Sequence, residues 1–268
     1  MKAKFEVYAN GLPVKLKMFQ FSGGEYQVDL SEYPLIAATV SPGFHIKAFI
    51  LNGDIMPLAL IVDSIRRTFP TARIGLEMPY LPYARQDRVM NAGESLACKV
   101  FCDAINALDF ERVYVSDCHS DVGLALLKNV VNVQFAMPNE YAYVLNPLSN
   151  PYDVLVAPDA GALKKSYKIA QTYGIKELVR ADKLRNVQNG EITGTVVYGN
   201  VEGKKTIICD DICDGGMTFL KLGEELRKQN PKSLHLHVTH GIFSKGKEEL
   251  LKIFDTVTAT YDYEVMFK

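Results

Sequence analysis

The chain lacks several features that would point to particular classes of protein. Its 268 residues contain no stretch of 18 apolar residues, and residues 1–19 lack the unbroken apolar run of a signal peptide. The five cysteines are odd in number and form no CxxC pair, which argues against a disulfide framework and a zinc site. We therefore expect a cytoplasmic protein with reduced, mostly buried thiols and no attachment to a membrane.

A net charge is also nearly absent. Thirty Lys and Arg residues balance 31 Asp and Glu residues, so no overall field would recruit nucleic acid or an anionic membrane. Any binding of anions must therefore be local. The hydrophobic content of 48% is ordinary for a globular protein, and the length suits one large domain or two smaller ones.

Short apolar strands alternate with helical patterns, which predicts an α/β fold of mostly parallel sheets flanked by helices. The first series consists of strands at 46–51, 73–77 and 112–116 with helices at 57–67, capped by Asp54, and 94–108. The second series consists of a strand at 154–157, a helix at 163–173 ended by Gly174, a strand at 175–179, a hairpin joining 192–198 to 205–209, a helix at 218–227, a strand at 234–239 and a helix at 245–253. The rhythm restarts after Pro138, which predicts two domains at 1–137 and 138–268.

The strongest local signal is the segment TIICDDICDGGMT at 206–218. An apolar strand runs into adjacent carboxylates, a glycine pair and a hydroxyl at the start of a helix. Ligands of open α/β sheets bind at the carboxyl ends of strands, and a helix N-terminus with glycine-freed N–H groups can hold phosphate. Asp210 and Asp211 could accept hydrogen bonds from a cis-diol. The alternative is a solvated acidic turn in which Asp214 caps the helix.

This segment resembles the phosphoribosyl-pyrophosphate loop, an apolar strand followed by DDxxDTGGT, of type I phosphoribosyltransferases and ribose-phosphate pyrophosphokinases. Further segments, in the same order, resemble motifs of the pyrophosphokinases: PYLPYARQDR at 79–88, RVYVSDCHS at 112–120, VAPDAG at 156–161, DKLR at 182–185 and THGIFS at 239–244. The chain thus resembles a short, divergent member of the ribose-phosphate pyrophosphokinase family. The resemblance implies two tandem type I phosphoribosyltransferase-like domains. It also implies ATP-dependent transfer of a diphosphate to the C1 hydroxyl of ribose 5-phosphate, giving phosphoribosyl pyrophosphate and AMP.

The resemblance assigns an ATP site to residues on two segments. Two guanidiniums in one loop can grip triphosphate oxygens in a planar fork. In the family, an aromatic and an acidic residue near the N-terminus reach the adenine in a neighbouring subunit, so a homo-oligomer is implied. The ATP-binding residues are then Arg85, Gln86, Asp87, Arg88, Phe21 and Glu25. Gly23 stands where the family has Asp, which weakens the implied adenine contact.

The resemblance likewise assigns the acceptor, metal and catalytic residues. Ribose-phosphate binding is implied for Asp210, Asp211, Asp214, Gly215, Gly216, Met217 and Thr218. His119 is implied to contact the Mg-ATP unit, Asp159 to coordinate Mg²⁺, and Lys183 and Arg185 to act in catalysis with His119. Without the resemblance, His119 reads as a satisfied structural histidine and residues 183–185 as a solvated basic loop.

Departures from the family pattern keep alternatives open. The run at 214–218 has one hydroxyl fewer than the family's cradle, and Met217 stands where the family has Gly. The change from a hydroxyl residue to Gly opens room at the 5-phosphate. A larger acceptor such as ADP-ribose, serving NAD re-synthesis, is therefore a second expectation. A phosphoribosyltransferase is disfavoured by the ARQDR loop. A non-catalytic regulatory homologue is disfavoured because Lys183, Arg185, His119 and Asp159 are retained.

Overall fold

The fold is that of a computed structural model, which describes residues 3–31, 43–135, 151–185 and 192–268. Contacts divide the chain into two units, residues 1–134 with Phe267 and residues 135–266 with Lys268. The predicted boundary at 137–138 falls outside the described ranges. No helix in those ranges has the length and apolar character needed to cross a bilayer.

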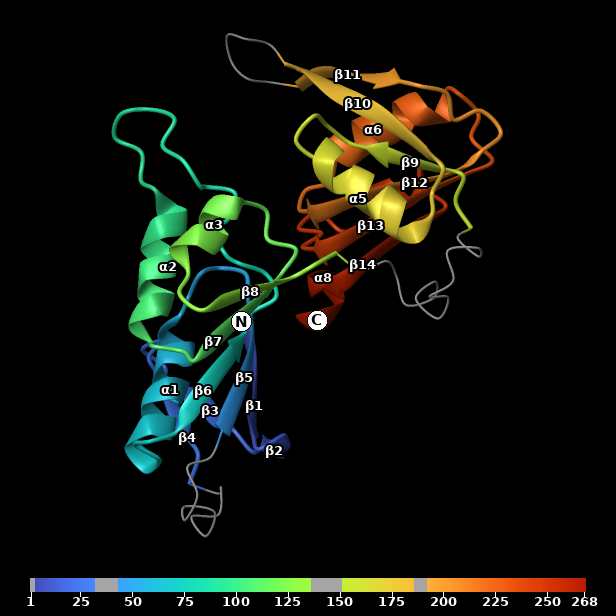
Figure 1. Ribbon diagram of the computed structural model, residues 1–268. Coiled ribbons are helices and arrows are strands. Elements are labelled where there is room, and N and C mark those ends of the chain that lie inside the picture. Colours follow the sequence, from blue (N-terminus) through green and yellow to red (C-terminus); the bar gives the residue numbers. More distant parts are fainter. Residues whose placement is uncertain (1–2, 32–42, 136–150, 186–191) are drawn as a thin grey trace. The chain divides into compact units, whose positions relative to one another are not determined.

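The N-terminal unit is built on a six-stranded sheet with the order β2-β1-β5-β6-β7-β8 (Figure 1). Strands β5 to β8 are parallel, and β1 is antiparallel to both of its neighbours. Beside the sheet lie a small antiparallel hairpin and three helices. The elements are β1 (Ala3–Ala9), β2 (Leu12–Val14), β3 (Lys17–Gln20), β4 (Tyr26–Asp29), β5 (Gly43–Ile50), α1 (Met56–Thr68), β6 (Arg73–Glu77), α2 (Ala97–Ala107), β7 (Arg112–Ser116), α3 (Asp121–Leu126) and β8 (Val130–Val133).

One hydrophobic core joins the helices of this unit to its sheet. Helix α1 buries Leu58, Ile61 and Ile65, whose spacing of three and four residues places them on one face. Helix α2 buries Phe101 and Ile105 in the same way. These side chains pack in one cluster with alternate residues of the strands. The polar residues therefore gather at the ends of the strands and in the loops that connect them.

The C-terminal unit has a second six-stranded sheet with the order β11-β10-β9-β12-β13-β14. All neighbouring pairs are parallel except β10 and β11. The elements are β9 (Val154–Ala157), α5 (Leu163–Tyr173), β10 (Glu177–Arg185), β11 (Ile192–Tyr198), β12 (Lys205–Cys213), α6 (Met217–Arg227), β13 (Ser233–Gly241), α7 (Glu248–Leu251), β14 (Thr256–Asp262) and α8 (Tyr263–Met266).

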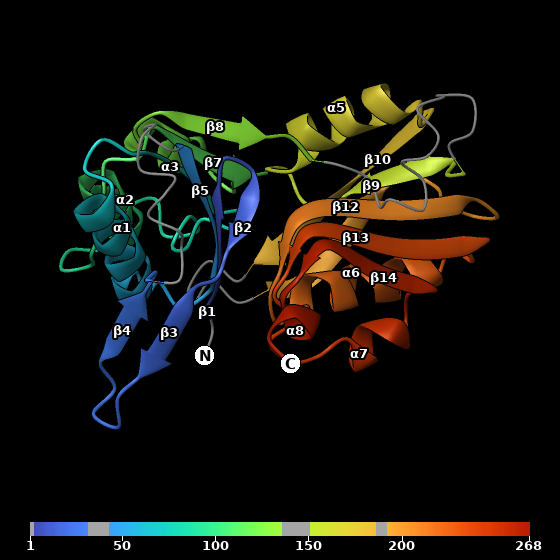
Figure 2. The ribbon, with the colours of Figure 1, turned by 90° about the horizontal axis from the view of Figure 1, so that it is seen from below.

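Helices cover both faces of this sheet, with α5 and α6 on opposite sides (Figure 2). Strand β9 shows why: Leu155 packs in the cluster that contains Ile169 of α5, whereas Val154 and Val156 pack in the cluster that contains Phe219 of α6. Successive side chains of a strand point to opposite faces, so a fully apolar strand requires cover on both. The continuous apolar run of β9 therefore marks a central strand.

The predicted fold class is confirmed, and several predicted elements, among them 112–116 and 163–173, have the observed bounds. The predicted hairpin between 192–198 and 205–209 is wrong. Strand β11 pairs with β10 instead, while β12 lies between β9 and β13 in the parallel part of the sheet. The strand predicted at 175–179 also extends to Arg185, because β11 provides it with an antiparallel partner.

We expect the core of the C-terminal unit to be sensitive to single truncations. Leu236 on β13 is fully buried among Val154, Leu222 and other apolar side chains. The Leu236→Ala variant should lose about 2–5 kcal/mol of unfolding free energy, because it loses the transfer free energy of the deleted atoms and leaves a cavity in the core. Urea denaturation measures this difference in unfolding free energy. Leu251→Ala, at a site that is 52% exposed, is the control and should stay within about 0.5 kcal/mol of the parent.

Candidate active site

Two loops of the N-terminal unit meet where the neighbouring parallel strands β6 and β7 end. The loop after β6 is hydrogen-bonded to β7 from its first residues: Met78 N–H donates to Tyr114 O over 2.8 Å, and Ser116 N–H donates to Pro79 O over 2.9 Å. The loop after β7 contains His119. Parallel pairing directs both loops to the same edge of the sheet.

A polar pocket of about 530 Å³ lies between these loops, lined by Arg85, Asp87, Arg88, His119, Ser120, Asp121 and Val122. A second pocket of about 640 Å³ shares the first three of these residues and is completed by Gln86, Met90, Glu94 and Ser95. Segments that are about thirty residues apart in the sequence thus line one site. Both pockets have enough room for a small organic ligand.

Asp87 organises the first pocket. Its Oδ1 accepts a hydrogen bond from Arg88 Nε at 2.8 Å, and its Oδ2 accepts from Arg88 Nη2 at 3.2 Å and from Ser120 Oγ. The Arg88 guanidinium and then the Ser120 hydroxyl lower the pKa of this carboxyl to about 2. The Asp87 side chain is 8% exposed and that of Arg88 is 71% exposed, so the pair holds a guanidinium at the surface of the pocket.

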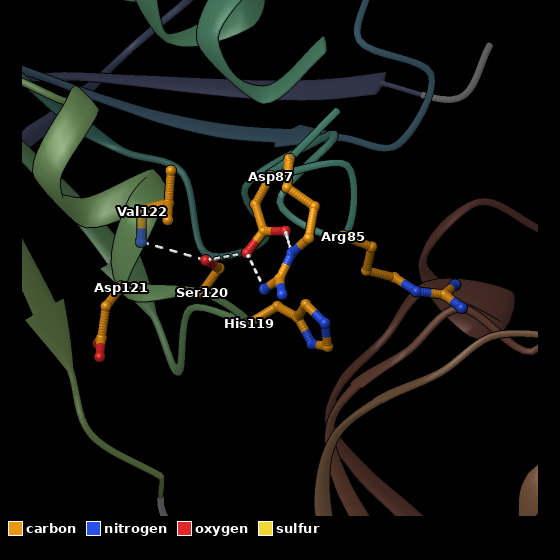
Figure 3. A pocket seen from close by; sticks show the side chains of 7 residues that line it. Arg85, Asp87, His119, Ser120, Asp121 and Val122 are labelled. Carbon is orange, nitrogen blue, oxygen red and sulfur yellow. Dashed lines mark hydrogen bonds and ion pairs between the residues drawn. The ribbon is translucent and has the colours of Figure 1, made fainter. Parts of the chain in front are cut away.

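Ser120 connects three parts of the site (Figure 3). Its hydroxyl donates to Asp87 in the first loop and accepts from Val122 N–H at 3.1 Å, which caps the start of α3. His119, the preceding residue, is exposed at the pocket. One hydroxyl therefore fixes the arginine-bearing loop relative to the histidine-bearing loop.

The predicted ATP-binding residues Arg85, Gln86, Asp87 and Arg88 thus lie with His119 around the two pockets. The two guanidiniums and the imidazole can bind an anionic ligand that carries several oxygen atoms, and the carboxylates of Asp87, Asp121 and Glu94 also line the pockets. Phe21 and Glu25 lie elsewhere, at the turn of the β3–β4 hairpin, where both are exposed. The Phe21 ring contacts Phe19 edge-on with centroids 4.9 Å apart, and Phe21 N–H donates to Glu25 O.

A second candidate site follows β12 in the C-terminal unit. The strand runs through Asp210 and Asp211 to Cys213, longer than predicted. Burial, and next the carboxylate of Asp211, raise the pKa of Asp210 well above its usual value. Asp210 Oδ1 accepts from Asp211 N–H at 2.9 Å. A carboxyl that keeps its proton can donate a hydrogen bond to a hydroxyl group, and the adjacent carboxylate can accept one.

The turn after β12 leads into α6 through Gly215 and Gly216. Gly216 is the N-cap and has a φ of 75°, a conformation that favours glycine. The alternative in which Asp214 caps the helix is therefore wrong. Asp214 O accepts from Ser244 N–H at 3.2 Å, which joins the turn to the segment after β13. Met217 begins α6 and is 51% exposed, and Thr218 is partly buried.

The remaining predicted residues of this unit lie at the ends of neighbouring strands. Asp159 follows β9, which is parallel to β12, and its Oδ1 accepts from Ala162 N–H at 2.9 Å. Lys183 and Arg185 belong to β10, opposite Thr195 and Ile192, with a register shift between Leu184 and Arg185. They do not follow the strand, as predicted, but form its end. Their side chains lie outside the described part of the chain.

Comparisons with known proteins agree on this two-part organisation. Residues 8–108 match the model of the N-terminal domain of ribose phosphate pyrophosphokinase, and residues 139–264 match that of the phosphoribosyl transferase domain. A ribose-phosphate pyrophosphokinase of Pasteurella multocida is 29% identical over 84% of this chain and 70% of its own. One of Shewanella oneidensis is 30% identical over 90% of this chain and 76% of its own. The chain belongs to the ribose-phosphate pyrophosphokinase family.

A solved member of this family has the same fold. The phosphoribosylpyrophosphate synthetase of Mycobacterium smegmatis superposes with a TM-score of 0.73 over 92% of this chain and 80% of its own, at 23% identity. The predicted family and fold are thus confirmed, and the relatives are diphosphotransferase enzymes.

Sequence reasoning missed the role of Ser120 in this pyrophosphokinase-like site. No sequence pattern relates the Ser120 hydroxyl to Asp87, 33 residues earlier. The available signal was local: Ser followed by Asp121 at the start of an apolar stretch is typical of a helix N-cap.

We expect Ser120→Ala to destabilise the site. The variant loses a helix cap and a charge-assisted hydrogen bond, which together predict a loss of about 1–3 kcal/mol of unfolding free energy at neutral pH. Ser95→Ala is the control, because Ser95 is an exposed residue that lines only the second pocket. Urea denaturation of both variants beside the parent provides the measurement, and equal stability of the two would contradict the role of Ser120.

The loss should also depend on pH in a defined direction. The folded pKa of Asp87 is about 2, below the value of about 4 of an unfolded aspartate. Its interactions therefore contribute stability above pH 4 that is lost as the pH falls through 2. Part of the difference between parent and Ser120→Ala should thus shrink on acidification through this window.

Proposed function

We propose that this protein transfers the β,γ-diphosphoryl group of ATP to the C1 hydroxyl of ribose 5-phosphate, producing phosphoribosyl pyrophosphate and AMP. The observation that carries the proposal is the first pocket, which Arg85, Arg88 and His119 line from two loops. Guanidiniums are suited to bind the triphosphate oxygens of ATP. The family membership of the chain supports the same reaction.

The chemistry requires positioning and charge stabilisation rather than a nucleophilic side chain. The sugar O1 attacks the β-phosphorus in line, the bond from the β-phosphorus to the oxygen of the α-phosphate breaks, and AMP leaves. Negative charge spreads over the phosphate oxygens in the transition state. Guanidiniums that are already held in place stabilise it without reorganisation, as the Asp87–Arg88 pair allows.

The turn after β12 is the proposed acceptor site. Asp210 and Asp211 would hold the ribose hydroxyls, and the N–H groups freed at Gly215 and Gly216 would hold the 5-phosphate. The raised pKa of Asp210 supports this role, because a carboxyl that keeps its proton can donate to one hydroxyl while its neighbour accepts from another. Lys165 partly offsets the shift by its positive charge.

The residues present fit Mg²⁺ as the cofactor. The described ranges contain no group of three or more His, Cys, Asp or Glu residues that could enclose a metal. Mg²⁺ is commonly held by one or two carboxylates together with substrate phosphates and water. Asp159 would supply an oxygen ligand to the ion, and His119 would contact ATP in the first pocket. When bound, Mg²⁺ neutralises charge on the phosphates.

The exposed hairpin tip supports a homo-oligomer. Phe21 is 52% exposed and is braced by Phe19, and Glu25 is also exposed. An aromatic ring and a carboxylate at the end of a projecting hairpin can contact an adenine bound in another subunit. We propose that the hairpin completes the ATP site of a neighbouring copy.

The acceptor has a second candidate, because Met217 is exposed at the start of α6. A thioether provides no donor to a phosphate dianion but can pack against a larger group. ADP-ribose, whose 5-phosphate carries a further phosphate, is therefore tested together with ribose 5-phosphate.

One assay tests the reaction and the acceptor. The full chain is incubated with Mg-ATP and equal amounts of both acceptors, and nucleotides and sugar phosphates are separated and weighed by mass spectrometry. We expect AMP, a ribose 5-phosphate heavier by one diphosphoryl group, and unchanged ADP-ribose. A diphosphorylated ADP-ribose would instead establish the second acceptor. The proposal would be overturned if several preparations of folded protein formed no AMP from ATP with either sugar.

The end of β10 provides a catalytic test. Lys183→Ala and Arg185→Ala should each lower kcat roughly 10²-fold with little change in the KM for ATP, because their charges matter mainly in the transition state. Lys176→Ala, exposed just before the other end of β10, is the matched control. Steady-state kinetics of the three variants decide it, and an unchanged kcat in both test variants would remove their proposed role.

A further inference from the structure

Three of the five cysteines gather behind the first pocket. Cys98 and Cys102 lie on successive turns of α2, and Cys118 lies in the loop after β7, beside His119. All three surround Gly123 on α3. A Cβ added to Gly123 would lie 3.3 Å from the sulfur of Cys118 and 3.6 Å from that of Cys98. Both sulfurs therefore lie within 3.6 Å of one point.

The three thiols differ in accessibility. Cys98 and Cys102 are fully buried, whereas Cys118 is only partly buried and immediately precedes His119, which lines the first pocket. Cys102 points to the backbone of α3, with its sulfur 4.0 Å from Gly123 O. Burial raises the pKa of the Cys98 thiol and raises that of Cys102 to about 12, which disfavours both as the first thiol to react.

We propose that Cys118 and Cys98 form a peroxide-sensitive modification site, in which the partly exposed Cys118 is oxidised first and Cys98 then resolves it to a disulfide. The Cys118 sulfur attacks one peroxide oxygen, the O–O bond breaks and a water molecule leaves, which produces a sulfenic acid. The Cys98 sulfur then attacks the Cys118 sulfur, the S–O bond breaks and a second water molecule leaves. Two thiols lose two electrons and two protons, and hydrogen peroxide is reduced to two water molecules.

The disulfide would act on the pocket because each cysteine is joined to one of its loops. Cys98 N–H donates to Gln86 O at 3.2 Å, which holds the arginine-bearing loop against the start of α2. Cys118 immediately precedes His119, and its backbone N–H donates to Asn132 Oδ1 at 3.2 Å. An S–S bond of about 2.05 Å requires the two sulfurs to approach each other, so the loop with His119 must shift. Oxidation should therefore weaken binding in the pocket.

The sequence allows the proposed disulfide to be located by peptide mapping. Trypsin cleaves after Arg88, Lys99, Arg112 and Lys128, which places Cys98, Cys102 and Cys118 in three separate peptides, 89–99, 100–112 and 113–128. The reduced full chain is treated with hydrogen peroxide, remaining thiols are alkylated, and digests are compared by mass spectrometry with and without dithiothreitol. We expect a reducible cross-link between 89–99 and 113–128.

Matched variants separate the roles of the two buried thiols. Cys98→Ser should abolish the cross-link and leave Cys118 oxidised to sulfenic or sulfinic acid, whereas Cys102→Ser should leave the cross-link in place. A cross-link that joins 100–112 to 113–128, or alkylation of Cys118 in full after peroxide treatment, would overturn the proposal. Circular dichroism of each variant checks that it folds before the comparison is made.

The effect on the pocket rests on the proposed function, whereas the cross-link does not. Binding of ATP to reduced, oxidised and re-reduced protein is measured by equilibrium dialysis. We expect oxidation to abolish most binding, and dithiothreitol to restore it, in the parent and in Cys102→Ser but not in Cys98→Ser. Unchanged binding by cross-linked protein would refute the coupling. Absence of ATP binding by reduced protein would count against the proposed function alone, since the peptide map stands independently.

Discussion

Parallel pairing of β6 with β7 is the constraint on which the first site depends. Gly75, Leu76 and Glu77 lie opposite Arg112, Val113 and Tyr114, so both strands run in the same direction and end at the same edge of the sheet. Both following loops therefore begin at this shared edge, and backbone hydrogen bonds from Met78 to Tyr114 and from Ser116 to Pro79 join the loop after β6 to β7. The apolar faces of the strands lie in the core, which leaves the polar chemistry to this edge.

The charges in the first pocket are then arranged by a few side-chain contacts. The side chain of Asp87 is only 8% exposed, and a carboxylate with so little access to water is stabilised by hydrogen bonds and ion pairs. Arg88 and Ser120 satisfy it, one from its own loop and one from the next. The same contacts that stabilise the carboxylate hold a guanidinium at the pocket and the His119 loop in register. Stability and function are therefore coupled at this residue.

In the C-terminal unit, backbone groups contribute more to the candidate site than they do in the first pocket. The carboxyl end of β12 carries two adjacent aspartates, and the turn after it uses Gly216 in a left-handed conformation to begin α6. Hydrogen bonds from Ile242, Phe243 and Ser244 to the backbone of this turn hold it against the end of β13. In the proposed function, a pocket built from side chains and a turn built from backbone N–H groups would bind phosphate by different means.

Several errors in the sequence interpretation have one cause. Strand β11 was expected beside β12, its nearest strand along the chain, but it closes the other edge of the sheet beside β10. Residues 182–185 were expected in a loop, yet their pairing with β11 makes them a strand. Propensity is local, whereas strand pairing joins distant segments, so neither error could be removed from the pattern of apolar residues alone.

The sequence by itself determined the family, the α/β class, most helices and strands, and the identity of the residues in the arginine-bearing and diphosphate-type loops. These follow from short motifs and apolar periodicity, which are properties of neighbouring residues. Only the tertiary structure decided which loops share a pocket, that Ser120 reaches Asp87, and that Cys98 and Cys118 face one point beside Gly123. Such contacts depend on strand order and on the close packing of α2 and α3, and neither can be read from neighbouring residues in the sequence.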